Sequence, residues 1–292
     1  MSILLVLILV LPAALYALSW FGDWRVFAAQ RQMASAPAGA DGNAIQVASS
    51  SGPAVLLLIG LLAHLVSLYF VTLAGPVFRF GFAQALSATL FVGVAVLWIE
   101  GYRVRVAALR ALILPLAVVA VLLPLFFPGV ELAEIRLRPL FVSHLLVGTL
   151  AYGVLLLAAL HAGLMTAAER ALHGAGARRR SLLGMLLEEL PPLLVLERML
   201  FTLIRFGFVL LTLTAISGVF FTEEIFGQPL RFDHKTVFTL IAWVVFGVLL
   251  LGRKLRGWRG RGALRATIAG YGVLFLAYVG SRFVIEVIIG RM

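Results

Sequence analysis

The sequence predicts an all-α, polytopic membrane protein with about eight transmembrane helices and a short interfacial elbow helix. Of its 292 residues, 62% are hydrophobic and only 13% are charged, which is more apolar surface than a soluble domain of this size can bury. The apolar runs are continuous and do not alternate with polar residues, which favours helices over a β-barrel. The basic residues lie mostly between these runs, so the net charge of +11 indicates contacts with lipid headgroups and not with nucleic acid.

The apolar runs divide the chain into a first span, a linker and a larger membrane domain. We expect a first transmembrane helix within residues 1–22, retained because no basic residue precedes it and no clear cleavage site follows. Residues 23–52 are rich in Ala, Ser and Gly and predict a flexible cytoplasmic linker. Residues 53–292 predict a seven-helix domain with spans at 53–74, 82–99, 107–127, 139–165, 200–221, 234–252 and 263–289. Residues 167–199 hold pieces too short to span, which predict an elbow lying along the membrane surface.

The distribution of Lys and Arg between the spans predicts the orientation. If the N-terminus is outside, the inner loops hold sixteen basic residues and the outer loops hold five. Because basic loops stay in the cytoplasm, we expect a multi-pass membrane protein with both termini on the outer, periplasm-like side. His144 and His234 then lie near the outer face.

Histidines carry most of the functional signal, because ionisable groups within a membrane span are costly and mark functional sites. His64, His144 and His234 lie on three separate predicted spans. The chain has no cysteine, so His is its only good ligand for a transition metal, and neutral imidazoles on apolar walls suit haem iron better than zinc. For His64, which lies about 16 Å along its span, the alternative is a neutral imidazole hydrogen-bonded to a neighbour such as Ser67.

Other polar residues have simpler alternatives beside a functional one. His161 and His173 are expected at the interface or in solvent. Asp233 could cap the N-terminus of the helix that follows it. Arg282 and Glu286 are spaced for a local ion pair, although a guanidinium such as Arg282 could also hold a haem propionate.

Sequence signatures of hydrolases, kinases and dinucleotide-binding enzymes are absent. The chain has no Gly-rich phosphate loop after a strand, no G-x-S-x-G and no H-E-x-x-H. We therefore expect a protein without catalytic activity of its own.

Several segments resemble one known family. They are PPLLVLERMLF at 191–201, LLTLT at 210–214 followed by SG at 217–218, FDHK at 232–235, IAW at 241–243, GWRGR at 257–261 and LAYVGSR at 276–282. Together these segments resemble the cytochrome c assembly protein family of the CcsA, CcmC and HemX type, and in particular its YpjD-like inner-membrane branch. The resemblance covers about the last 150 residues well and the first 130 mainly through His64.

The resemblance implies a bacterial membrane protein that handles haem. Asp233 matches the Asp of the family's outer Trp-Asp-Pro motif, His144 matches the first outer histidine, and His64 resembles an intramembrane one. This chain lacks the tryptophans of the motif and the second outer histidine. His234 is then the candidate to replace that histidine as a ligand, and Glu286 lies near the position where the family has it.

The leading hypothesis is a protein that binds non-covalent, b-type haem near the outer face and assists cytochrome c assembly together with other assembly or membrane proteins. His144 is the first candidate for the iron ligand, with His64 or His234 as the second. A regulatory or scaffold subunit related to haem biosynthesis is the first alternative. A transporter using His64 is the second, although no inverted repeat is evident.

Overall fold

The computed structural model describes residues 3–34, 52–75, 77–104, 106–132, 139–172, 187, 190–226 and 233–290. Within these residues, eight helical stretches are long and apolar enough to cross a membrane, which confirms the predicted fold class. The long helices are α1 (Ile3–Ala34), α2 (Gly52–Thr72), α3 (Phe82–Glu100), α4 (Ala107–Leu122), α5 (Pro139–Leu172), α7 (Leu193–Phe226), α8 (His234–Arg256) and α9 (Arg261–Phe275). The last span continues from α9 through η4 (Leu276–Gly280), α10 (Ser281–Phe283) and η5 (Val284–Ile288).

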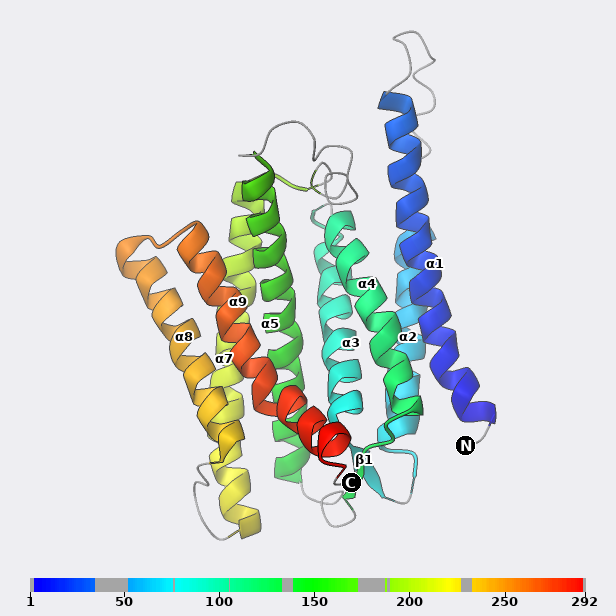
Figure 1. The fold of residues 1–292 in the computed structure, drawn as a ribbon, viewed down its shortest axis with the longest axis vertical. Coiled ribbons are helices and arrows are strands. Elements are labelled where there is room, and N and C mark those ends of the chain that lie inside the picture. Colours follow the sequence, from blue (N-terminus) through cyan, green and yellow to red (C-terminus); the bar gives the residue numbers. More distant parts are fainter. Residues whose placement is uncertain are drawn as a thin grey trace.

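The helices form two groups that meet along one seam. Helices α1 to α4 pack on one another, as do α5, α7, α8 and α9, and α3 lies against α5 between the groups (Figure 1). At this seam a Cβ added to Gly153 would lie 2.4 Å from Cβ of Val92. A side chain on Gly153 would therefore force the two helices apart, because interiors are close-packed.

A short two-stranded sheet closes one end of the bundle. Strands β1 (Phe78–Phe80) and β2 (Val130–Leu132) are antiparallel, with Phe78 paired to Leu132. Figure 1 shows β1 at the same end of the molecule as both chain termini. We call this the sheet end, and we call the opposite end, where a tight turn joins α8 to α9, the turn end.

The first helix is longer than its apolar run, so the predicted start of the linker at residue 23 is wrong. Helix α1 continues to Ala34, and residues 35–51 of the expected linker lie outside the described residues. The extension is held against α4, where Arg110 donates to Asp23 over 2.7 Å and the Trp20 indole donates to the carbonyl of Ala111 over 3.0 Å. A run of polar and small residues in the sequence does not reveal such tertiary contacts.

Both ends of the predicted elbow belong to long helices in the structure, so its predicted bounds are too wide. Its first part, residues 167–172, continues α5, and residues 193–199 belong to α7. Apart from residues 187 and 190–192, the part between these two helices lies outside the described residues.

Candidate functional site

His64 lies in the group formed by α1 to α4. Its ring is 0% exposed, with Nδ1 3.0 Å from the Tyr16 hydroxyl of α1 and Nε2 2.9 Å from the Ser87 hydroxyl of α3. Both nitrogens of the ring are thus engaged, which is how a neutral polar side chain joins membrane helices. The expected partner was wrong, because the Ser67 hydroxyl donates instead to the backbone carbonyl of His64 over 2.7 Å.

His144 lies in the other group, near the sheet end of α5. Its Nδ1 is 3.0 Å from the Ser217 hydroxyl of α7. The backbone of α7 also approaches the ring closely, since a Cβ added to Gly218 would lie 3.3 Å from Cε1 of His144. The ring is half-buried between the two helices, so one side is packed while part of it reaches the surface.

Asp233 and His234 begin helix α8 at the sheet end. The Asp233 carboxylate is the N-cap, accepting from the backbone N–H of Thr236 over 2.9 Å and from its hydroxyl over 3.0 Å. Partial burial raises the pKa of Asp233, but the bonds from Thr236 and the positive charges of Lys235 and His234 outweigh burial and hold this pKa below its ordinary value. The N-cap alternative is therefore confirmed for Asp233. The His234 side chain is exposed.

A cationic cluster, made of Lys235, Tyr278, Arg282 and Glu286, lies at the same end. The Arg282 guanidinium is 3.8 Å from the Glu286 carboxylate, as expected from their spacing. The Lys235 ammonium lies 5.5 Å and the Arg282 guanidinium 6.0 Å from the centre of the Tyr278 ring, which both cations face. The buried Glu286 carboxylate also accepts from the N–H of Phe82, the first residue of α3. The cluster therefore joins the last helix to α3 and α8.

The helix that carries the cationic cluster is irregular. Both η4 and η5, on either side of Arg282, are π-helical. Wide turns of this kind shift side chains away from the positions of a regular helix and are frequent at functional sites. In addition, Nε of Arg282 and Oε1 of Glu286 are buried without a hydrogen-bond partner among the described residues. A ligand with a polar oxygen could satisfy the guanidinium.

Aromatic side chains pack together inside the sheet end beside the cationic cluster. Phe78 and Phe80 of β1 are stacked with their ring centres 5.7 Å apart. Phe141 of α5 lies edge-on against Phe78 at 5.8 Å, and Tyr278 lies 5.8 Å from Phe80. These rings connect the start of α5, three residues before His144, with the helix that carries Arg282.

The structure brings only some of the predicted site residues to one end. His144, Asp233, His234 and Arg282 belong to the sheet end, whereas His64 is enclosed by α1, α2 and α3 in the other helix group. Among the described residues, no three His, Cys, Asp or Glu side chains are grouped so that they could hold a metal ion. Two small cavities, of about 90 and 60 Å³, lie near the turn end within the described part of the chain.

The prediction that His161 lies at the membrane interface or in solvent is wrong. The ring is 0% exposed, with Nδ1 2.9 Å from the carbonyl of Leu157 and Nε2 3.6 Å from the carboxylate of Glu100 at the end of α3. Glu100 and His161 both lie toward the turn-end limits of their spans. Their similar depth was the available signal, but depth alone does not show which side chains face each other.

Comparison with known proteins gives a consistent family assignment. The profile of the family described as Cytochrome C assembly protein matches residues 53–289. The inner membrane protein YpjD of Escherichia coli strain K12 is 32% identical over 193 residues, which is 66% of this chain and 70% of that protein.

Two cyanobacterial proteins called cytochrome c biogenesis protein CcsA match shorter segments. The one from Thermosynechococcus vestitus is 35% identical over 29% of this chain and 27% of its own length, and the one from Synechococcus sp. strain JA-3-3Ab is 37% identical over 34% and 29%. No solved structure matches. The chain belongs to the cytochrome c assembly protein family.

Proposed function

We propose that this protein binds haem non-covalently at the sheet end of the bundle and assists cytochrome c assembly without catalysing a reaction. The observation that carries the proposal is the gathering of a half-buried imidazole, two cations and a set of aromatic rings at one end of a chain of this family. Other assembly proteins would then deliver the haem or receive it.

The residues at the sheet end fit the parts of a haem. His144 would face the iron, with His234 as the second candidate, because imidazole nitrogen is a common axial ligand. Arg282 and Lys235 would hold the propionates. The buried Nε of Arg282 is a hydrogen-bond donor without a partner among the described residues, so it could donate to a propionate oxygen. A chain without cysteine cannot attach haem through thioethers, so the haem would be of the b type.

His64 fits a ligand role poorly in this structure. Both of its ring nitrogens already lie within hydrogen-bond distance of Tyr16 and Ser87, so binding iron would require one of these contacts to break inside the helix group. We therefore propose His64 as a residue that joins helices and keep it as a ligand candidate only for a rearranged state.

The haem would lie at the surface of the sheet end, where the His144 ring is half-buried and the His234 side chain is exposed. Within the described residues, two small cavities of about 90 and 60 Å³ lie near the turn end, away from these histidines. An exposed position suits a protein that must pass haem on.

A spectroscopic experiment tests the proposal. The protein is purified in detergent, incubated with haem, and its Soret band is recorded for the wild type and for His144→Ala, His234→Ala and His64→Gln. We expect a shifted Soret band in the wild type, loss of that band in His144→Ala, and its retention in His64→Gln. An unshifted band in the wild type, or an unchanged band in His144→Ala, would contradict the proposal.

We also propose that the sheet end faces the periplasm in a bacterial inner membrane. The support is the excess of Lys and Arg at the turn end. Because the chain has no cysteine, the variants Ser2→Cys and Arg256→Cys each carry one thiol, and labelling of that thiol shows on which side of the membrane its position lies. We expect a membrane-impermeant maleimide to label cells at position 2 only, and labelling at position 256 only would reverse the orientation.

A further inference from the structure

The turn between α8 and α9 is a rigid structure at the ends of two spans. Helix α8 ends at Gly257, whose φ of 65° is left-handed, and the backbone N–H of Trp258 donates to the carbonyl of Gly252. The Trp258 indole lies directly on Gly252, where an added Cβ would be 2.4 Å from the ring. Gly260, with φ 64°, then starts α9. The turn therefore holds its side chains in defined positions.

Two carboxylates tie this turn to α5 and α7 through arginines. Glu197 of α7 pairs with Arg253 at 2.6 Å and lies 3.6 Å from Nε of Arg259. Glu169 of α5 lies 3.5 Å from Nε of Arg261. The contacts of Arg259 and Arg261 are longer than the 2.7–2.9 Å of strong charge-assisted bonds, and these two side chains remain 64% and 60% exposed. They are positioned by the carboxylates without being enclosed.

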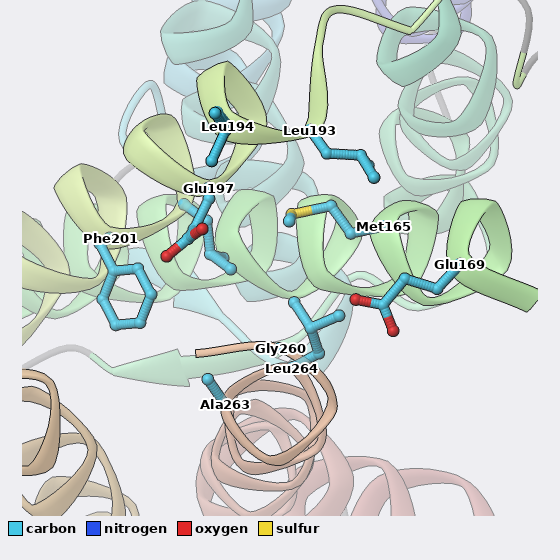
Figure 2. Close-up of a pocket in the computed structure, with 10 residues that line it drawn as sticks. Met165, Glu169, Leu193, Leu194, Glu197, Phe201, Gly260, Ala263 and Leu264 are labelled. Carbon is cyan, nitrogen blue, oxygen red and sulfur yellow. The ribbon is translucent and has the colours of Figure 1, made fainter. Parts of the chain in front are cut away.

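Positive charge exceeds negative charge at this turn. The turn and its flanks carry six cations between positions 253 and 265, whereas the carboxylates that pair with them among the described residues are Glu169 and Glu197. The six are Arg253, Lys254, Arg256, Arg259, Arg261 and Arg265. Arg259 and Arg261 lie on either side of Gly260, which lines the cavity of about 90 Å³. Figure 2 shows Met165 and Glu169 of α5 on one side of this cavity and Ala263 and Leu264 of α9 on another. The site thus combines two exposed guanidinium groups with a small, mostly apolar recess.

Exposed apolar side chains next to these cations favour a lipid over a soluble acidic partner. Trp258 is 41% exposed and Leu255 is 70% exposed. A Trp with neighbouring basic residues at the end of a span is typical of the headgroup level of a membrane. A guanidinium also matches the geometry of a phosphate oxygen pair.

We propose that Arg259 and Arg261 bind the phosphate of an anionic phospholipid, with the neighbouring recess taking an apolar part of the same lipid. This site is at the turn end, so it is separate from the proposed haem site and does not depend on it. Lys254 and Arg256, exposed on the last turn of α8, provide matched controls because their removal changes the charge equally.

The test compares lipid binding by three double variants and the wild type in detergent. Retention of phosphatidylglycerol against phosphatidylcholine is measured by native mass spectrometry, together with thermal unfolding in phosphatidylcholine alone. We expect Arg259→Gln with Arg261→Gln to weaken phosphatidylglycerol binding at least tenfold, and Lys254→Gln with Arg256→Gln to weaken it less than threefold. Arg259→Lys with Arg261→Lys keeps the charge, and we expect an intermediate loss because the guanidinium forks are gone. If the double Gln variant does not fold, this double Lys variant gives the comparison.

Four outcomes would overturn the proposal. Equal weakening in the two Gln variants would show a diffuse charge effect, and equal retention of phosphatidylcholine would show no headgroup preference. Displacement of the lipid by soluble glycerol phosphate at comparable concentration would indicate a free phosphate site. Displacement by a polyglutamate peptide would indicate an acidic peptide site.

Discussion

The ion pair between Asp23 and Arg110 tests how burial determines the contribution of a charge pair to the free energy of unfolding of this protein. Asp23 Oδ1 lies 2.7 Å from Arg110 Nη2, and the two side chains are 6% and 20% exposed. Removing one partner of a buried pair costs about 3–5 kcal/mol, because the other charge is left buried and unpaired. Arg110 keeps some access to solvent, so we expect Asp23→Ala to cost about 3 kcal/mol and Arg110→Met, which isolates the more buried carboxylate, about 4 kcal/mol.

The double variant separates pairing from burial. Asp23→Ala with Arg110→Met removes both charges and both desolvation penalties, so we expect a cost of about 1 kcal/mol and a coupling energy of several kcal/mol. The free energy of unfolding would be measured by steric trapping in lipid bicelles. Arg79 and Glu131 of the small sheet provide the control, because their pair is just as short at 2.6 Å but its side chains are 50% and 55% exposed.

Exposed pairs contribute about 0–1 kcal/mol, so Arg79→Ala should have little effect. If Asp23→Ala destabilised the protein no more than Arg79→Ala does, the reasoning from burial would fail. A double variant as unstable as the sum of its singles would also refute it, since the two charges would then not interact.

Substitutions at three further contacts provide additional tests. Gly153→Ala should destabilise the protein by about 1–3 kcal/mol through overpacking at the α3–α5 seam, and Val92→Gly should recover part of the loss in thermal unfolding; no loss would show that the seam can widen freely. Tyr16→Phe should cost about 0.6–1.7 kcal/mol by leaving His64 without one partner, and an unfolding midpoint equal to that of the wild type would contradict this. Asp233→Ala should cost about 1 kcal/mol at neutral pH. Since the pKa of Asp233 is lowered in the folded protein, the difference in stability between the wild type and Asp233→Ala should vanish as the pH falls through that pKa. A stability difference that persists in strong acid would refute the N-cap account.

Local interactions were predictable from the sequence. The N-cap at Asp233 and the ion pair of Arg282 with Glu286 involve residues three or four positions apart, and the structure contains both. Such contacts depend on helix geometry, which places these positions on neighbouring turns whatever the rest of the fold does. The spans themselves were predictable for a similar reason, because each apolar run must be long enough to cross the bilayer.

Contacts between helices were not predictable in the same way. The partners of His64, the burial of His161 against Glu100 and the continuation of α1 past Asp23 all depend on which face of one helix meets another. Depth along a span follows from counting residues, whereas the facing direction depends on packing throughout the bundle.

The sequence by itself therefore determined an eight-span helical membrane protein, its basic and less basic ends, and the local caps and pairs of its helices. Only the tertiary structure decided that His64 packs with α1 and α3 while His144 lies between α5 and α7, and that Arg282 and Lys235 both lie against the Tyr278 ring. The physical reason is that hydrophobic length acts on each helix separately, whereas a polar side chain inside a membrane is satisfied by whichever neighbour the packed helices bring to it.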